Sequence, residues 1–329
     1  MANYQTNYLL DVKDQAIISD LSLNARASLS SLARATGLSR QVISYRLDNL
    51  EEKGIIENYY TILNIFKLGF LYHRIAFRFR NVSPEIEGQI VDFFMQHKNV
   101  GWVCQLDGDL DLAIAVWTRT IVEFENVLHE SLNRIGSYVE EKKISIATKI
   151  HHLKYNFLSD KAVDLSDLVV SGEIEATALS EIDYDILGIL TKSPRRTNTE
   201  IGKSLKIQPQ VVNYHIRNLM DQGIILGFNL KLNLQLLGYT HYKIYLNLVN
   251  ILEPGFTKLI HYLKSLRNTI YITKPLGMAD LEFELLAKNS EEFHKTLKDL
   301  RYQFPDLIKS YSAIVFRKER YINYLPLKK

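Results

Sequence analysis

Cysteine is almost absent from this sequence, whose 329 residues include only Cys104. A single thiol cannot close an internal disulfide and has no companion cysteine for a zinc site, so we expect Cys104 to pack as a small hydrophobe in a strand. No uninterrupted apolar run approaches the roughly 20 residues that span a bilayer, and Met1 to Leu10 lacks the basic and apolar pattern of an export signal. We therefore expect a cytoplasmic protein with no membrane contact.

Patterns typical of enzymes are missing as well. The sequence contains no Ser-His-Asp, Cys-His, phosphate-loop or paired-carboxylate pattern. Nine histidines are present, but only His151 and His152 are adjacent, and neighbours in a strand point to opposite faces and so do not chelate one ion. We expect no catalytic residue, no metal site and no cofactor, and hence a protein that is not an enzyme.

The sequence contains one pattern of residues twice, and equivalent residues of the two copies lie 169 positions apart. Gly54-Ile55-Ile56 recurs as Gly223-Ile224-Ile225. The same step links Asp14 to Asp183, Arg26 to Arg195, Tyr45 to Tyr214, Gly69 to Gly238, Gly108 to Gly277, Asp111 to Asp280 and Phe124 to Phe293. A period this long, present only twice, indicates duplication of a whole two-part module. One polypeptide therefore contains the two modules that a homodimer would supply on two chains.

The first part of each copy has the pattern of a winged helix-turn-helix. In the first copy, a helical run from Leu10 to Leu23 precedes a helix that Ser28 caps, a turn at Gly37 and a third helix over Arg40 to Lys53 that Ser39 caps. The second copy repeats the frame with a capping box at Thr197 and Glu200, a turn at Lys206 to Gln208 and Pro209 in the first turn of its third helix. Gly54 to Tyr60 and Gly223 to Phe228 are expected to form the β-wings.

The third helix of each copy should bury one stripe of side chains and expose the opposite face. The buried stripes are expected to comprise Val42, Ile43, Leu47 and Leu50, and Val211, Val212, Ile216 and Leu219. Gln, Asn, Ser and Arg match the donor and acceptor pattern of base edges in the major groove. The candidate base-reading residues are Arg40, Gln41, Ser44, Tyr45, Gln210, Asn213, Tyr214 and Arg217. Nearby cations placed for phosphates are Arg26, Arg34, Arg46, Arg195, Arg196, Lys203 and Lys206. The pattern predicts a protein that binds double-stranded DNA.

The second part of each copy predicts a βαββαβ, or ferredoxin-like, domain. In the first copy the expected elements are His73 to Phe79, Pro84 to His97, Gly101 to Leu106, Leu110 to Trp117, Val122 to Ile135 and Ile144 to Ile150. In the second copy they are Tyr242 to Leu248, Pro254 to Leu266, Ile270 to Lys274, Leu281 to Ala287, Glu291 to Phe304 and Ala313 to Arg317. One face of each sheet is left bare by its helices and should be buried against the other copy.

An acidic segment separates the two copies. Residues 156–178 carry five carboxylates and one lysine, whereas the whole chain has a formal charge of +3, so the modules themselves are basic. The fold class is α+β. The predicted domains are a winged helix-turn-helix at 1–62, a ferredoxin-like sensing domain at 63–155, the acidic linker at 156–178, a second winged helix-turn-helix at 179–231 and a second sensing domain at 232–329.

These residues carry a family resemblance. The string NARASLSSLARATGLSRQVISYRLDNLEEKGIIENYYTILN, followed by Leu68-Gly69 and by Gly108-Asp109-Leu110-Asp111, resembles the Lrp/AsnC (feast/famine) family of prokaryotic transcription regulators. The second copy, SPRRTNTEIGKSLKIQPQVVNYHIRNLMDQGIILGF, keeps the frame. The second copy departs from the family at Lys206, which stands where the turn glycine is usual. In the first copy, Asn58 stands where the family's wing often has glycine.

The resemblance implies a DNA-binding regulator whose sensing domains dimerise through their sheets and associate further. It also implies an amino acid or similar small molecule as effector, bound near the Gly-x-x-Asp turns. Carried over to this chain, the effector site comprises Asp107, Gly108, Asp109, Asp111, Gly277 and Asp280. For the glycines, a plain hairpin turn is the alternative explanation.

Two other functions are compatible with the same architecture. The siroheme decarboxylases share the two-domain design and are enzymes, but a polar recognition helix such as that of the first copy has no use in an enzyme. A metabolite sensor that no longer binds DNA is the third possibility, and the polar residues Gln210, Asn213 and Arg217 on the second copy's helix argue against it. The sequence therefore favours a transcriptional regulator built as a single-chain pseudo-dimer.

Overall fold

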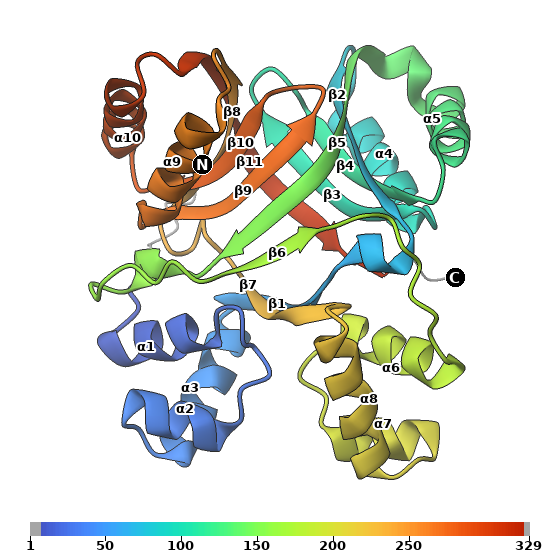
Figure 1. Ribbon diagram of the computed structural model, residues 1–329, viewed down its shortest axis with the longest axis vertical. Coiled ribbons are helices and arrows are strands. Elements are labelled where there is room, and N and C mark those ends of the chain that lie inside the picture. Colours follow the sequence, from blue (N-terminus) through green and yellow to red (C-terminus); the bar gives the residue numbers. More distant parts are fainter. Residues whose placement is uncertain (1–7, 326–329) are drawn as a thin grey trace.

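The computed structural model describes residues 8–325 and contains two copies of one module, with the strands of both sensing domains in the upper half of Figure 1 and both helical domains in the lower half. The first copy comprises α1 (Val12–Leu21), α2 (Leu29–Thr36), α3 (Arg40–Glu52), β1 (Ile56–Leu63), η1 (Ile65–Leu68), β2 (Leu71–Phe79), α4 (Pro84–Gln96), β3 (Val100–Asp107), β4 (Leu112–Thr118), α5 (Ile121–Ile135), η2 (Gly136–Tyr138) and β5 (Val139–Leu153). The linker contributes η3 (Asn156–Leu158) and β6 (Asp167–Ser171). The second copy comprises α6 (Glu181–Lys192), α7 (Asn198–Leu205), α8 (Pro209–Asp221), β7 (Ile225–Leu232), β8 (Thr240–Leu248), α9 (Glu253–Ser265), β9 (Thr269–Leu276), β10 (Leu281–Ala287), α10 (Ser290–Gln303) and β11 (Ile308–Ile322).

The helix starts are those that the capping residues predict. The hydroxyl groups of Ser28 and Ser39 accept hydrogen bonds from backbone amides three residues on, at the starts of α2 and α3. Thr197 and Glu200 form a reciprocal capping box at α7, and Pro209 occupies the first turn of α8. Each cap satisfies backbone donors that a helix start would otherwise leave open. The two helical domains therefore follow directly from local sequence.

The turn between the second and third helices is equally tight in both copies. Gly37 ends α2 with φ 71° and ψ 15°, and Lys206 ends α7 with φ 57° and ψ 38°. The lysine thus adopts the left-handed conformation that glycine adopts without strain. The missing glycine does not loosen the second turn.

Replacing Lys206 with glycine is expected to stabilise the protein by about 1 kcal/mol, because a side chain in the left-handed region costs roughly that amount. The matched variant Gly37→Ala is expected to destabilise by a similar amount, since an added Cβ at Gly37 meets nothing within 4 Å and only the backbone conformation opposes it. Urea unfolding midpoints measure both changes. A Lys206→Gly variant with a lower midpoint would show that the lysine side chain contributes more than its backbone strain costs.

The expected wings do not form within each copy. β1 pairs antiparallel with β7, and the register places Tyr60 opposite its own equivalent, Asn229. The resulting two-stranded sheet lies between the helical domains and the sensing domains (Figure 1). A lone strand leaves its backbone groups unpaired, and the equivalent strand of the other copy satisfies them. The predicted wing strand is therefore present in each copy, and its partner, which the sequence left open, is the equivalent strand of the other copy.

The sensing domains do not stack as two separate sheets. β2, β4 and β3 continue through β11 into β8, β10, β9 and β5, and β5 pairs back with β2, which closes an antiparallel barrel. The closure depends on β5 and β11, which are 15 residues each and much longer than predicted. The first half of each strand pairs inside its own copy, and the second half pairs with β9 or β3 of the other copy. The sheets of the two copies are thus joined edge to edge, and the faces that their helices leave bare are buried inside the barrel.

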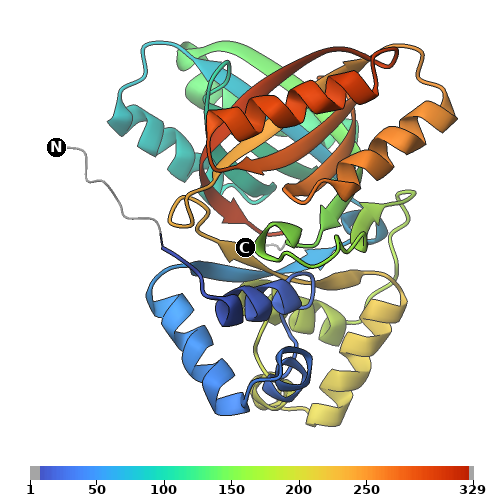
Figure 2. The same ribbon diagram turned by 90° about the vertical axis from the view of Figure 1, so that its left-hand side faces the viewer.

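Helices cover the outside of the barrel, with α4 and α5 on one side and α9 and α10 on the other (Figure 2). Ile75, Phe77 and Ile114 of the strands pack with Phe94 and Phe124 of the covering helices. Side chains of the opposite parity, among them the buried Cys104, face the inside. No helix within residues 8–325 combines the length and the apolarity needed to cross a membrane.

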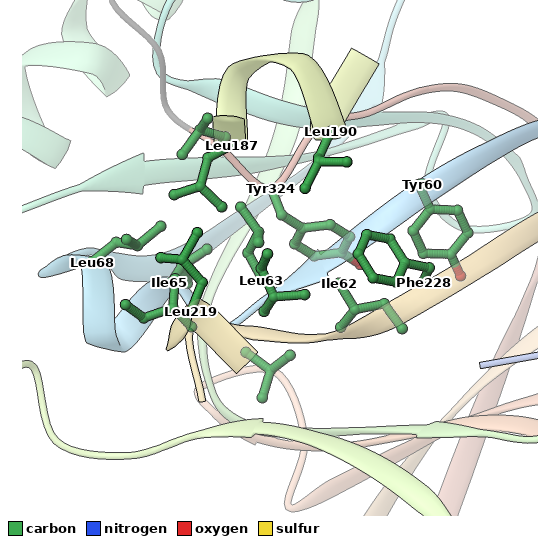
Figure 3. Packing of buried hydrophobic residues seen from close by; sticks show 14 of the residues in the cluster. Tyr60, Ile62, Leu63, Ile65, Leu68, Leu187, Leu190, Leu219, Phe228 and Tyr324 are labelled. Atoms are coloured by element: carbon green, nitrogen blue, oxygen red, sulfur yellow. The ribbon is translucent and has the colours of Figure 1, made fainter. Parts of the chain in front are cut away.

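Each helical domain completes its core with a strand from the other copy. Figure 3 shows Ile62 and Leu63 of β1 beside Leu187, Leu190 and Leu219 of the second copy's helices. The hydroxyl of Thr61 also donates to the carbonyl of Leu190 at 2.6 Å. In the reciprocal cluster, β7 residues of the second copy pack with the apolar residues of α1 to α3. The two copies are therefore interlocked below the barrel as well as within it.

Candidate nucleic-acid interface

The third helices α3 and α8 present most of their candidate base-reading side chains to solvent. Arg40, Gln41 and Tyr45 of α3 are exposed, as are Gln210, Tyr214 and Arg217 of α8. Ser44 and Asn213 are half-buried, and the Asn213 Oδ1 accepts a hydrogen bond from Asn198 at 3.3 Å. Both helices lie on the side of the molecule opposite the barrel (Figure 1). The sequence-predicted residues are thus brought together on one end of the protein.

The two equivalent tyrosines, Tyr45 and Tyr214, have exposed fractions of 72% and 66%. Val42 and Val211, expected in the buried stripes, are 37% and 38% exposed, so the prediction of their burial was wrong. They lie one position before Ile43 and Val212, which take the core-facing place and are fully buried. Each third helix therefore offers a broader surface than expected, with an apolar residue at its edge.

Arg26 and Arg195 are half-buried and connect the two helical domains. The Arg26 guanidinium donates to the carbonyl of Arg196 at 2.8 Å and lies over the ring of Phe228, and Arg195 donates to the carbonyl of Ala25 at 3.0 Å. These equivalent arginines thus cross between the two helical domains in opposite directions. These contacts tie both arginines to the partner domain, and phosphate contact by either side chain stays a prediction.

Arg46 is also engaged within the protein. Its guanidinium contacts the carboxylates of Asp11 and Asp14 at 2.8 and 2.7 Å. In the second copy His215 and Asp183 stand at the equivalents of Arg46 and Asp14, and their side chains lie 2.8 Å apart. The pair anchors the first helix to the third in both copies. The Nη1 atom of Arg46 is thus paired within the protein, and phosphate contact by this arginine stays a prediction.

The cations that remain free lie around the two third helices. Arg34 on α2 and its equivalent Lys203 on α7 are exposed, and Lys206 follows at the turn. Arg196 is half-buried and donates to the hydroxyl of Ser204 at 2.6 Å. Among residues 8–325, Arg34, Arg40, Lys203 and Arg217 make no ion pair. Such unpaired cations suit contact with a polyanion.

The two Gly-x-x-Asp turns lie at the seams between the copies. Gly108 and Gly277 have φ of 128° and 121°, and a Cβ added to Gly277 would stand 2.6 Å from the carbonyl oxygen of Ile144 in the first copy. Asp111 and Asp280 accept backbone amides of Phe79 and Leu248 at 2.7 Å and so tie each turn to the end of β2 or β8 in the same copy.

The neighbouring Asp107 and Asp109 are exposed and form ion pairs, with Arg317 at 3.5 Å and with Arg78 at 3.3 Å. Binding of an effector by the six residues of the two turns stays a prediction. Within residues 8–325 no group of three or more His, Cys, Asp or Glu side chains is arranged to hold a metal ion.

A charged cluster inside the barrel was not foreseen from the sequence. Arg74 and Lys243 stand at equivalent positions, and both reach the fully buried Glu282, at 2.8 and 3.1 Å. Lys243 also contacts Glu284 at 3.2 Å. Burial raises the pKa of Glu284, but the charges of Lys243 and His241 outweigh it and hold that pKa at about 2. The only signal in the sequence was a pair of acidic residues alternating with apolar ones in β10.

The first copy has no carboxylates at the equivalent places. Ala113 and Ala115 correspond to Glu282 and Glu284 in the step of 169. The second copy therefore neutralises the interior cations of both copies. An unpaired buried charge is strongly destabilising. A first copy paired with a second copy should therefore be more stable than a pair of first copies or a pair of second copies.

His152 on β5 is fully buried, and neither of its ring nitrogens has a hydrogen-bond partner among the described residues. Its ring lies against Tyr271 and Tyr324, and burial lowers its pKa to about 3. The native state therefore excludes a proton that the unfolded chain binds near pH 6.5, so stability falls as the pH drops from about 6.5 towards 3.

At pH 5 the difference amounts to about 2 kcal/mol relative to pH 7. His152→Phe is expected to remove this contribution and to leave that of His73, whose pKa burial also lowers, whereas the exposed control His129→Gln should keep both. Urea unfolding at several pH values measures the effect. An unchanged pH profile in His152→Phe would contradict the buried neutral histidine.

Comparison with known proteins agrees with this geometry. Residues 10–57 and 179–225 each match a family model described as winged helix-turn-helix DNA-binding. The transcriptional regulator LrpA of Pyrococcus horikoshii is 27% identical over 146 residues, which is 44% of this chain and 100% of the relative. The proline dehydrogenase transcriptional activator of Rhodobacter capsulatus is 26% identical over 128 residues, 39% of this chain and 83% of the relative.

A solved structure extends the likeness to both copies. The siroheme decarboxylase NirDL has a TM-score of 0.60, covers 95% of this chain and 93% of its own, and is 15% identical. An identity this low establishes a common fold and nothing further.

The fold and the two matched regions define a DNA-binding protein of the winged helix-turn-helix class. Its sequence relatives are transcriptional regulators that each correspond to about one copy. The chain is similar in sequence to regulators of the Lrp/AsnC type, and its winged helix-turn-helix is present twice on one polypeptide.

Proposed function

We propose that this chain is a sequence-specific regulator of transcription that binds DNA as a single-chain equivalent of a dimer. The observation that carries the proposal is the pair of exposed third helices on one end of the molecule, held by the crossed contacts of Arg26 and Arg195. Crossed ties of this kind fix the separation of two recognition helices, as a dimer interface does when it sets half-site spacing.

The chemistry of the exposed surface supports the same function. Tyr45 and Tyr214 keep large aromatic surfaces in water at equivalent places, and Arg40 and Arg217 flank them without ion pairs in the described part of the chain. Arginine and glutamine donate to base edges, while Arg34 and Lys203 suit phosphates. The surface therefore carries side chains for phosphate contacts, which supply affinity, and side chains for base contacts, which distinguish one DNA sequence from another.

Duplex binding measured against salt concentration tests the proposal. We expect the logarithm of the binding constant to fall linearly with that of salt, at about −0.9 per neutralised phosphate. Arg34→Ala and Lys203→Ala should each reduce the slope by about one contact, whereas Arg40→Ala should cost roughly 1–3 kcal/mol and relax base preference. The control is Lys298→Ala on α10, at the far end of the molecule (Figure 1). No measurable duplex binding at low salt would favour a sensor or an enzyme instead.

We further propose that an amino acid or another small metabolite modulates binding at the Gly-x-x-Asp turns, and that chains self-associate through their sensing domains. The position of both turns on the seams between copies supports this, because a ligand there would bias how the copies meet. Duplex binding repeated with a pool of amino acids tests it. The enzymatic alternative is carried by the fold neighbour alone, and we do not propose it.

A further inference from the structure

One edge of the barrel is covered in the first copy and open in the second. Residues Lys149 to Leu153 of β5 pair on one side with β9 and on the other with the linker strand β6. The equivalent stretch of β11, Lys318 to Ile322, pairs on one side with β3. Among residues 8–325 no strand covers its other side. The step of 169 therefore identifies the open edge as the counterpart of the place that β6 occupies.

Cavities lie where a second β6 would be. A cavity of about 370 Å³ is lined by Lys231, Asn233, His241 and Arg317, and one of about 750 Å³ by Asn58, Lys192, Lys318 and Arg320. Glu57, Tyr60 and Glu319 line both. In the first copy the amide of Asn64 donates to the backbone carbonyl of Ser171 in β6 at 2.8 Å. Its equivalent, Asn233, lines the first cavity instead.

Side chains cap the open edge. The backbone carbonyl of Glu319 accepts from the Lys231 ammonium at 2.7 Å, and that of Arg317 accepts from the Gln235 amide at 3.1 Å. At the covered edge the equivalents of Lys231 and Gln235 are the buried apolar residues Ile62 and Phe66. Lysine on a strand edge is a common protection against unwanted pairing, and a flexible side chain is readily displaced by a backbone donor. Side chains thus satisfy two backbone carbonyls of the open edge, but no strand of the described part of the chain covers it.

Charge indicates what the edge would accept. β6 begins with Asp167, whose carboxylate lies 2.5 Å from His151 and 2.9 Å from Lys264. The equivalent of His151 at the open edge is Arg320, and the exposed Lys318 and Lys192 line the same cavity. An acidic side chain at the first position of an added strand would therefore find cations.

We propose that the open edge of β11 binds an extended, acidic segment of a partner polypeptide by strand addition, with the chemistry of the chain's own Asp167–Ser171. Main-chain hydrogen bonds to residues 318–322 supply affinity, and an aspartate facing Arg320 and Lys318 fixes the register. This surface lies between the barrel and the β1–β7 sheet, where Asn58 and Lys192 line the same cavity as Arg320, and it includes no residue of α3 or α8.

A labelled peptide that copies residues 164–172 tests the proposal by fluorescence anisotropy with the full chain. We expect saturable binding that Lys318→Glu weakens at least tenfold. The matched control is Lys149→Glu, which makes the same change at the equivalent, covered edge and should leave binding unchanged. A peptide carrying lysine at the place of Asp167 should bind at least tenfold more weakly.

Hydrogen exchange gives a second, independent measurement, because peptide binding should slow the backbone amides of residues 317–321. Binding equal to that of a scrambled peptide, or binding weakened by Lys149→Glu and not by Lys318→Glu, would overturn the proposal. A dimer of the chain that the peptide dissociates would place a second copy on this edge, and that result would overturn the choice of a different polypeptide as partner.

Discussion

Cutting the chain in the exposed stretch between Gly172 and Ala176 is expected to leave the two halves bound to each other under native conditions. Each half contributes strands to both barrel seams and one strand to the β1–β7 sheet. Each also completes the other's helical core, as Ile62 and Leu63 do for α6 and α8. Separation would expose all of these apolar surfaces at once, at about 25 cal/mol for each Å².

Charges inside the barrel make the association selective. Two second halves would bring together four carboxylates, from Glu282 and Glu284, with two copies each of Lys243 and His241 and without the Arg74 that pairs with Glu282. Two first halves would bury a pair of Arg74 side chains opposite alanines. Breaking a buried pair in this way costs about 3–5 kcal/mol for each uncompensated charge. The mixed pair should therefore form almost exclusively.

Native mass spectrometry of separately produced halves, refolded together, measures this preference. We expect one first half with one second half, and loss of that preference in a second half carrying Glu282→Ala with Glu284→Ala. The control Glu291→Ala changes an exposed carboxylate on α10 and should leave the pairing intact. Halves that ran as independent soluble monomers would refute the interlocked pseudo-dimer.

The sequence was sufficient for features that are set locally. Caps at Ser28, Ser39 and Thr197 fixed the helices, and period-2 alternation fixed the strands, because both depend on neighbours in the chain. The partner of a strand is not local information. β1 shows the same pattern whether it forms a wing or pairs with β7, and β5 has no residue that marks where its pairing passes from β2 to β9.

The same limit applied to the site. Arg26 and Arg34 look alike in a basic helical domain, yet one is tied to the partner domain and the other is exposed. The difference arises from a contact across 170 positions that only the folded chain creates. Exposed residues of the third helix were predictable because helical period alone places them opposite the core, with Val42 at the margin.

The preferred operator is expected to be asymmetric within one chain's footprint. Gln41 and Tyr45 of α3 have identical equivalents in α8, but Arg40 and Ser44 correspond to Pro209 and Asn213. Identical readers select a palindrome, with half-sites about one helical turn apart or a multiple of it. Here the half-sites should share the bases that face the common glutamine and tyrosine and differ where arginine faces one and asparagine the other.

Selection of bound duplexes from a random pool measures this asymmetry. A good bidentate contact discriminates by about 1–3 kcal/mol, so a guanine opposite Arg40 and an adenine opposite Asn213 should each be enriched roughly 5- to 150-fold. Asn213→Ser makes α8 resemble α3 at that position and should shift the second half-site towards the first. Arg40→Ala should blur only the first half-site, and Lys298→Ala should change neither. The unaltered chain could instead select a palindrome that Gln210→Ala with Asn213→Ala leaves unchanged. That result would mean that the second copy makes no sequence-specific contact with DNA.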